Sequence, residues 1–246
     1  MPSPFFADFW RVFVISLLLV SATSQAQPLI IGAYQYPPFM DEKTKDGLYI
    51  QLMKSIQTHS QLEFKWVFYP YARLDRFFNL GKIQLEIGSS PLWHQHKLTP
   101  GSFTDSFYQL EDVAIHRSGE NRRATSDTDI AGQDIGIVRG YSFPQFQQAF
   151  SQKIARRIEG ADEAQLLHLL INERIDQVFM SKQVFLYLQS RHSEYGNFVI
   201  GDVVGRYDVA IRVHPSQAQI IPALNRTIQI LKTNGTIKQL FNKPQP

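Results

Sequence analysis

The sequence predicts an α/β protein that is built in two parts. Apolar segments typical of strands alternate with segments of helical spacing, this alternation occurs twice, and a polar stretch separates the two runs. Strands that alternate with helices favour sheets covered by helices over an all-helical bundle or an all-strand sandwich. With 246 residues, the chain is long enough to form two cores.

The first run contains four predicted strands and two predicted helices. Short apolar or alternating segments predict the strands at residues 29–33, 63–68, 83–87 and 112–116. Apolar residues at helical spacing predict helices that begin near Leu48 and Leu74, and Gly81 is placed to end the second helix.

The second run follows residues 117–129 (RSGENRRATSDTD), a polar stretch without apolar periodicity that we interpret as a crossing between two lobes plus a surface loop. Further apolar segments predict strands at residues 134–138, 175–180 and 209–213. Helical spacing predicts helices at residues 142–150, 164–171 and 221–231, and a short last helix after Gly235.

Composition and motifs exclude several classes of protein. The formal net charge is only +3 and the basic residues are scattered, so no basic cluster is available to follow a nucleic-acid backbone. The sequence has no G-x-S-x-G motif, no P-loop and no dinucleotide fingerprint, and we therefore expect no cofactor. The chain has no cysteine, so an exported form must be stabilised by burial rather than by disulfides.

Residues 1–26 have the pattern of a cleaved secretory signal peptide. Arg11 precedes an apolar run that is too short to span a bilayer comfortably, and Ser24 and Ala26 form a small-x-small cleavage site. Cleavage there gives a mature chain that starts near Gln27; the alternative is an uncleaved N-terminal anchor. Because no cysteine can carry a lipid, we expect a soluble protein that an outer membrane retains in the periplasm.

Six segments, taken in order, resemble family 3 of the bacterial extracellular solute-binding proteins, the periplasmic components of polar amino-acid ABC importers. The segments cover nearly all of the mature chain, and none of them is diagnostic alone. They are GAYQYPPFMDEKTKDGLYIQLMKSI (32–56), YPYARLDRFFNLGKIQLEIGSSPLW (69–93), SFTDSFY (102–108), DIAGQDIGIVRGYSF (129–143), RYDVAIRV (206–213) and LNRTIQILKTNGTIKQLF (224–241).

The resemblance implies a two-lobed periplasmic-binding-protein fold of type II, with the ligand cleft between the lobes. Lobe 1 would contain residues 27–116 and 209–246, and lobe 2 would contain residues 117–208. The two crossings between the lobes would fall near residues 116–119 and 205–208, and the lobes would close over the ligand by hinge motion.

Aromatic residues of lobe 1 are the first candidates for ligand contact. Tyr36 lies at the end of a strand before two prolines that stiffen its loop. The resemblance implies that Tyr36 and Tyr71 stack on the ligand. Arg73 is a candidate for either ligand contact or a surface salt bridge, and Trp93 for either the cleft wall or simple packing.

Small and polar residues complete the predicted site. Ser89 and Ser90 follow a buried strand and offer hydroxyl groups to a ligand. In lobe 2, the segment Arg139, Gly140, Tyr141 and Ser142 links a strand to a predicted helix. Ser142 and Gln145 have the spacing of a capping box, and free N–H groups at a helix start attract anions, so a carboxylate is expected there. An ordinary capped turn is the alternative.

The sequence departs from the family at both charged anchors that hold an amino acid. The arginine that grips the α-carboxylate is replaced by His96 or Lys97, depending on the direction of counting, and neither has the bidentate fork of arginine. The acid that holds the α-ammonium is replaced by Ser181. Arg73 or Arg139 could substitute for the first anchor, whereas nothing obvious replaces the second.

Metal and enzyme functions are weaker alternatives. His94 and His96 have a spacing that metals use, but the neighbouring residues supply no acidic or cysteine ligand, so we expect no metal. Glu86 interrupts an apolar strand and is the one candidate for acid–base chemistry in a dehydratase-like member of the fold. We interpret Glu86 as an ordinary strand residue and expect no catalytic residue.

Together these observations predict a monomeric periplasmic protein that binds a small polar, carboxylate-bearing solute such as an amino acid. The expected partner is an ABC-type membrane permease. The alternative is a membrane receptor that reads the closed form, because import and sensing use the same closure.

Overall fold

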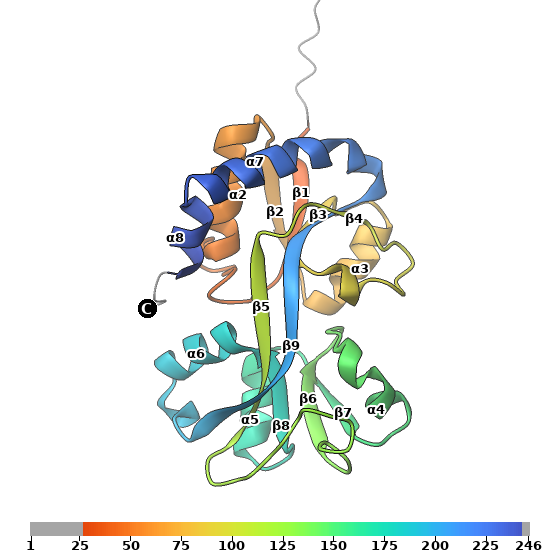
Figure 1. Ribbon diagram of the computed structural model, residues 1–246, viewed down its shortest axis with the longest axis vertical. Coiled ribbons are helices and arrows are strands. Elements are labelled where there is room, and N and C mark those ends of the chain that lie inside the picture. The colour runs from red at the N-terminus through yellow and green to blue at the C-terminus, as the bar shows by residue number, and fades with distance from the viewer. Residues whose placement is uncertain (1–26, 243–246) are drawn as a thin grey trace, which may run out of the picture.

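The structure is a computed structural model that describes residues 27–242. It consists of two α/β lobes joined by two long strands, β5 (Tyr108–Arg117) and β9 (Phe198–Val213), as Figure 1 shows. All strands form one path, β2-β1-β3-β9-β5-β8-β6-β7, with β4 paired to β9. The predicted α/β, two-lobed fold is confirmed. The predicted signal peptide lies outside the described residues.

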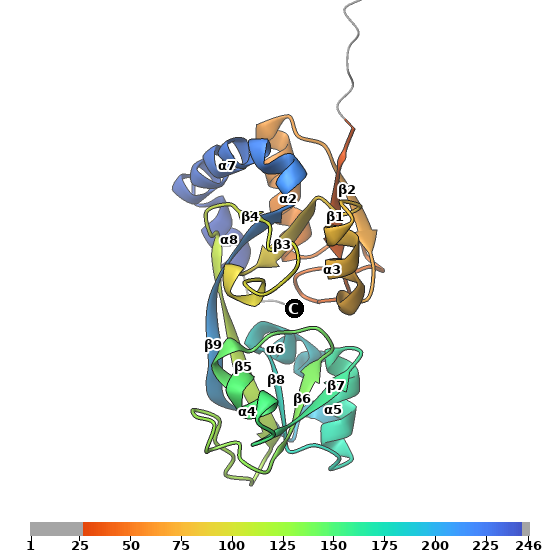
Figure 2. The same ribbon diagram turned by 90° about the vertical axis from the view of Figure 1, so that its right-hand side faces the viewer.

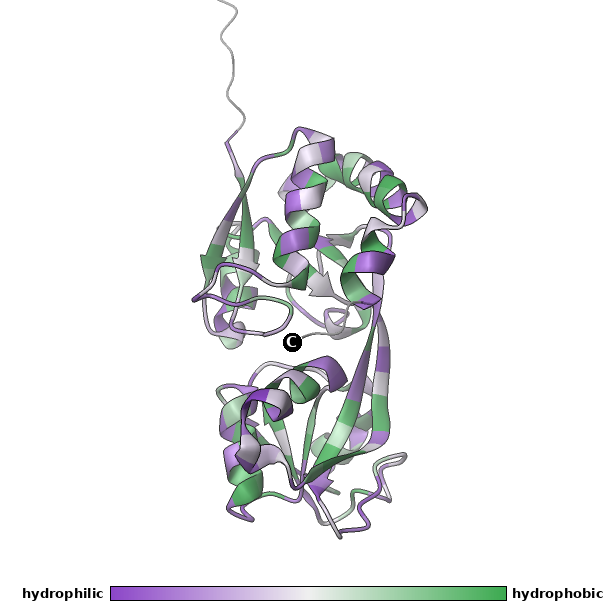
Figure 3. Cartoon of the chain, turned by 90° about the vertical axis from the view of Figure 1, so that its left-hand side faces the viewer, coloured by the Kyte–Doolittle hydropathy of each residue, from purple (hydrophilic) through white to green (hydrophobic). Residues whose placement is uncertain are grey.

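Lobe 1 is built on parallel strands. The strands β1 (Leu29–Ala33), β2 (Phe64–Phe68) and β3 (Leu85–Ser89) run parallel, β9 pairs antiparallel to β3, and the short β4 (Ser102–Phe103) pairs with β9. The lobe's helices are α2 (Leu48–Ser60), α3 (Tyr71–Asn79), α7 (Ile221–Thr233) and α8 (Thr236–Asn242). Figure 3 shows hydrophobic positions concentrated on the strands, whereas α2 and α7 alternate between apolar and polar residues. Their apolar faces therefore cover the core.

Lobe 2 repeats this architecture. Its strands β6 (Asp134–Val138), β7 (Arg156–Gly160) and β8 (Gln177–Ser181) run parallel, and its helices are α4 (Gln147–Ser151), α5 (Glu163–Ile171) and α6 (Lys182–Arg191). Asp162 caps α5 by accepting a hydrogen bond from the backbone N–H of Gln165 at 2.8 Å. This cap fixes the first residue of α5, Glu163, which faces the other lobe.

The position of the first crossing differs from the prediction. Residues 112–115 of β5 already pair with β8 inside lobe 2, so the chain crosses between the lobes before Asp112 and not at residues 116–119. The crossing, residues 108–111 paired with residues 206–209, alternates polar and apolar residues, whereas the polar stretch 117–129 is a loop of lobe 2. The polar composition of residues 117–129 identified a loop, whereas the position of the crossing follows from the strand pairing of β5.

The second correction concerns the helix predicted at residues 142–150. A 3₁₀ turn at Pro144–Phe146 precedes α4, which begins only at Gln147, and Ser142 caps neither element. The predicted capping box is therefore wrong. Proline at the start of the 3₁₀ turn tolerates the missing N–H there, so no cap is needed at Ser142.

A buried arginine organises lobe 1. The guanidinium of Arg212, on β9, is fully buried and donates to Glu86 on β3 at 2.7 Å and to Asp75 on α3 at 3.2 Å. It also lies 3.8 Å from the centre of the Phe78 ring and donates to the carbonyl of Pro100 at 2.9 Å. Burial raises the pKa of Glu86, although the charge of Arg212 opposes this. One cation thus ties two strands, a helix and a loop together.

Among residues 27–242, no helix has the length and hydrophobicity that a membrane span needs.

We predict that Arg212→Met destabilises the protein by about 3–5 kcal/mol, because removing one partner of a buried ion pair leaves Glu86 charged and uncompensated. Methionine retains the apolar stem, so lost charge dominates the effect. The measurement is urea denaturation at pH 7. The matched control is Arg206→Met on the same strand, whose side chain is 58% exposed and pairs with Glu111; it should cost at most about 1 kcal/mol. Equal losses in the two variants would contradict the prediction.

Candidate ligand-binding cleft

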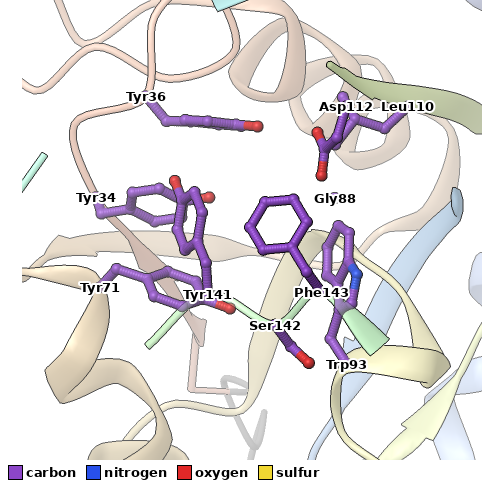
Figure 4. A pocket seen from close by; sticks show the side chains of 10 residues that line it. All are labelled: Tyr34, Tyr36, Tyr71, Gly88, Trp93, Leu110, Asp112, Tyr141, Ser142 and Phe143. Carbon is purple, nitrogen blue, oxygen red and sulfur yellow. The ribbon is translucent and has the colours of Figure 1, made fainter. Parts of the chain in front are cut away.

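A cavity lies between the lobes and takes its walls from both of them. It contains about 370 Å³ of empty space, counting its open mouth. Figure 4 shows its ten lining residues, which are Tyr34, Tyr36, Tyr71, Gly88, Trp93, Leu110, Asp112, Tyr141, Ser142 and Phe143. Six of the ten are aromatic, so aromatic rings form most of the cavity wall.

The aromatic rings form a connected cluster. The Tyr34 ring lies 5.0 Å from the Tyr36 ring and 4.9 Å from the Tyr71 ring, all in lobe 1. Tyr141 enters from lobe 2 and meets Tyr71 edge-to-face with their ring centres 4.7 Å apart. Edge-to-face pairs of this kind are favourable beyond the area they bury. Tyr141 is therefore the side chain through which lobe 2 contacts the aromatic wall of lobe 1.

Local backbone structure places the lobe-1 rings. The carbonyl of Tyr36 accepts hydrogen bonds from the N–H groups of Phe39 and Met40, both at 2.9 Å, so a tight turn fixes this tyrosine at the end of β1. Gly88 lies at a bulge of β3 with a φ of 73°, and a Cβ there would lie 2.1 Å from the ring of Tyr49. Only glycine fits, and its backbone is therefore exposed to the cavity.

Three features of lobe 2 position Tyr141. Gly140 has a φ of 95°, and a Cβ added there would lie 3.1 Å from the Tyr71 ring, so glycine permits the close approach of the lobes. Arg157 donates to the backbone carbonyl of Tyr141 at 2.9 Å. The hydroxyl of Tyr141 donates to Glu163 at 2.8 Å. Both ends of this residue are thus held by lobe 2.

Two buried carboxyl groups face the cleft region. Asp112, on β5, is 7% exposed, and its carboxylate points into the cavity in Figure 4. Within residues 27–242, no hydrogen bond or ion pair reaches this carboxylate. Burial raises the pKa of Asp112 to about 7, and the charge of Glu163 adds to the effect. Burial also raises the pKa of Glu163 to about 7, although its hydrogen bond from Tyr141 opposes this.

The strand irregularity beside Asp112 explains its orientation. The pairing of β5 with β9 changes register between Asp112 and Val113, where Asp112 opposes Gly205 and Val113 opposes Val203. Such bulges re-aim side chains and are common beside functional sites. Here the bulge lies beside the acid that points into the cavity between the lobes.

Five predicted site residues line this cavity, and a sixth adjoins it. Gly140 lines a wider recess of about 950 Å³, together with His96 and Lys97, and this recess shares Trp93, Tyr141 and Ser142 with the cavity. The predicted residues that line the cavity itself are Tyr36, Tyr71, Trp93, Tyr141 and Ser142. Whether these residues bind a ligand stays a prediction, and the structure adds their proximity.

The remaining predicted residues lie elsewhere. Arg73 and Arg139 are exposed, and Arg139 pairs with Glu159 at 3.3 Å. The three predicted serines are buried outside the cavity lining. They are Ser89, which bonds His94 at 2.7 Å; Ser181, which donates to Gln183 at 3.2 Å; and Ser90. Neither arginine is placed to replace the family's carboxylate anchor inside the cavity.

The two histidines of the H-x-H pair have separate environments. His94 is buried beside Ser89, and burial lowers the pKa of His94 to about 3. His96 is exposed at the wider recess, and the neighbouring Lys97 pairs with Asp75. In the part of the chain that the structure describes, no group of three or more His, Asp or Glu residues could hold a metal ion.

Sequence reasoning missed Tyr34, Asp112, Phe143 and Glu163. The Tyr34-x-Tyr36 pattern at a strand end was a usable signal, because alternate strand residues share a face. Asp112 lies at the start of an apolar strand segment, and Glu86 lies within another. An acidic residue that a strand buries without a neighbouring basic residue indicates a functional site. Glu163 gave no signal, because an acid in the first turn of a helix is ordinary.

Of the comparisons with known proteins, the one with solved structures identifies the fold. No protein-family model matches the chain, and the search of curated proteins finds no match. Among solved structures, a histidine kinase sensor domain with similarity to periplasmic binding proteins has a TM-score of 0.76 at 15% identity, over 87% of this chain and 94% of that one. The GluR0 ligand-binding core from Nostoc punctiforme, in complex with L-glutamate, has a TM-score of 0.73 at 20% identity, covering 87% and 98%. The substrate-binding protein of an amino-acid ABC transporter has a TM-score of 0.69 at 19% identity, covering 87% and 97%.

These likenesses establish the two-lobed binding-protein fold that the sequence resemblance implies.

We predict that the free energy of unfolding falls as the pH rises from 5 to 8. The folded chain holds protons on Asp112 and Glu163 up to about pH 7, whereas the unfolded chain releases them near pH 4, so these groups favour folding at low pH and lose that contribution above it. Urea denaturation of Asp112→Asn should lack at least about 1.4 kcal/mol of this decrease, the equivalent of one pKa unit. Asp208→Asn, an exposed aspartate on β9, should keep the whole pH dependence. Identical pH profiles for all three proteins would refute the assignment.

Proposed function

We propose that this protein is a periplasmic solute-binding protein that captures a small polar solute of amino-acid type and delivers it to an ABC importer. The observation that carries the proposal is the cavity whose walls come from both lobes, with Tyr34, Tyr36 and Tyr71 on one side and Tyr141 and Phe143 on the other. A ligand in such a cavity contacts both lobes only when they are closed. It therefore stabilises the closed form.

The connection between the lobes suits a hinge. Residues 108–111 of β5 pair only with residues 206–209 of β9, whereas the flanking residues also pair with β3 or β8. A two-stranded ribbon bends more easily than a wide sheet, because no further strand pairs with it on either edge. Figure 2 shows this ribbon along one side of the molecule. Closure would bend the ribbon at residues 108–111.

The amino-acid character of the solute rests on the fold and on the sequence resemblance. The GluR0 core binds L-glutamate, and the transporter protein serves amino-acid import. The solute's carboxylate, which the sequence analysis expects, would face the wider recess, where Lys97 and Arg157 lie. The aromatic cavity would hold the rest of the solute. We propose that the protein acts as a monomer. We also propose that it is not an enzyme, since Glu86, the candidate for acid–base chemistry, is paired with Arg212.

A sensing role is the second candidate. The observation that favours it is the likeness to the histidine kinase sensor domain, at a TM-score of 0.76. A sensing protein would present the closed form to a membrane receptor instead of a permease. Both roles need the same cleft, and the binding experiment below tests what they share.

We predict that a true ligand raises the melting temperature of residues 27–246 by roughly 5–10 °C. A ligand at 100 times its Kd adds about 2.7 kcal/mol, and each kcal/mol moves the melting point of a chain of this size by about 2–4 °C. The panel contains amino acids, amines, dicarboxylates, short peptides and sugars. Tyr141→Ala should at least halve the shift, because this residue joins the lobes, whereas Tyr187→Ala on α6 should leave it unchanged. A panel without any shift, or a ligand indifferent to Tyr141→Ala, would contradict the proposed site.

We predict that export removes residues 1–26. Expression in a Gram-negative host should yield a periplasmic form that begins at Gln27, as intact-mass measurement and N-terminal sequencing would show. Ala26→Leu should block cleavage, because the cleavage site needs small residues, and Ala22→Leu should not. Retention of the full-length chain in the membrane fraction would favour the uncleaved anchor.

A further inference from the structure

The lining of the cavity is unusual in its charge. Asp112 is the one charged side chain among its ten lining residues, and six of the others are aromatic. Asp112 is 7% exposed, and no described residue pairs with its carboxylate. A buried carboxylate without a counter-ion is costly, because it loses hydration and gains no partner. The cavity therefore contains a negative group that lacks a positive one.

The aromatic side chains of the cavity also favour a positively charged ligand. The faces of tyrosine and tryptophan rings carry negative potential and attract cations within about 6 Å of the ring centre. Figure 4 shows the rings of Tyr36, Tyr141 and Trp93 around the same space as the Asp112 carboxylate. Burial raises the pKa of Tyr36 and of Tyr141 well above its ordinary value, so both hydroxyls stay neutral. Ring faces beside a carboxylate are a recognition site for an organic cation.

The basic residues nearest the cleft do not offer an anion site inside the cavity. Arg139 is exposed and pairs with Glu159, and Arg157 bonds Glu159 and the carbonyl of Tyr141. Lys97 pairs with Asp75 at the wider recess. An anion in the cavity would instead meet the charge of Asp112. Charge therefore selects against an anionic group at this place.

We propose that the cavity binds the cationic head of a small organic ammonium compound, with Asp112 as its counter-ion and the rings of Tyr36, Trp93 and Tyr141 as its cage. The proposal rests on the proposed function, because it names the group that the same cleft recognises. An alkylated ammonium fits better than a primary amine, since it presents methyl groups to rings and needs few hydrogen-bond acceptors. A carboxylate elsewhere on the solute is then allowed but not required.

The test compares cations with neutral molecules of nearly the same shape. The pairs are choline with 3,3-dimethyl-1-butanol and tetramethylammonium with tert-butanol, titrated calorimetrically into residues 27–246 at pH 8. In at least one pair, we expect the cation to bind about tenfold or more tightly than its neutral partner, as cation–π and ionic contacts would produce. Equal binding within both pairs overturns the proposal, because shape alone would then explain binding.

Variants separate the charge of Asp112 from its shape. Asp112→Asn keeps the size of the side chain and should weaken binding of the cation about tenfold or more, while leaving the neutral partner's affinity unchanged. Asp127→Asn, the same substitution in the loop at residues 117–129 and outside the cavity lining, should change neither. Thermal melts of both variants check that the fold is intact. Unchanged cation binding in Asp112→Asn overturns the assignment.

The pH dependence of binding gives a second measure. The groups that act on the charge of Asp112 are Glu163 and the hydroxyls of Tyr36, Tyr49 and Tyr207, and the tyrosines stay neutral over the range tested. Cation binding should therefore strengthen from pH 6 to pH 8, as Asp112 loses its proton, and this increase should be clearly smaller in Asp112→Asn, in which only Glu163 still titrates in this range. Affinity that is constant with pH in the unmodified protein counts against the proposal.

Failure of this proposal can be told from failure of the proposed function. If both cations bind no better than their neutral partners while another solute of the melting panel shifts the melt and depends on Tyr141, the cleft binds a ligand of another class. The cation proposal is then overturned and the solute-binding function stands. If no solute of any class binds, both are overturned.

Discussion

The pairing of β5 with β9 is the interaction on which the rest of the structure depends. These two strands run through both lobes, and between the lobes, at residues 108–111 of β5 and 206–209 of β9, no third strand pairs with them. The same pairing carries the bulge beside Asp112, so the element that joins the lobes also presents the acid of the cavity. Connection between the lobes and recognition of a ligand are thereby parts of one ladder of hydrogen bonds.

Charge is handled in opposite ways at the two places where it is buried. In lobe 1, Arg212 neutralises Glu86 and Asp75, and the network fixes a helix, two strands and a loop. In the cleft, Asp112 has no such partner within the described chain, and its raised pKa of about 7 records that cost. In a structural ion pair, both charged groups belong to the protein. In a site that binds a charged ligand, the ligand supplies the counter-ion. The contrast supports the proposed role of Asp112 as a counter-ion for a ligand, whereas the Arg212 network belongs to the scaffold of lobe 1.

The order of strands and helices was largely predictable from apolar periodicity, because strand and helix spacing are local properties of the chain. Tyr36, Tyr71, Trp93 and Tyr141, which the sequence named as candidates, line the cavity, and their contact with a ligand stays a prediction. Arg73 and Arg139 lie outside the cavity lining, because a basic residue next to a cleft element can point either way, and nothing local decides its direction. The first crossing was misplaced for a similar reason: polarity identifies a loop but not the strands that join two lobes.

The sequence by itself determined the alternation of elements, the two α/β runs and the aromatic character of the loops that meet at the cleft. Only the tertiary structure decided that Asp112 points into the cavity, that Tyr141 contacts Tyr71 across the cleft, and that Arg212 reaches Glu86. These contacts join residues tens of positions apart in the chain. Periodicity reports which face of an element is buried. Which distant face meets it depends on the path of the chain and on strand register.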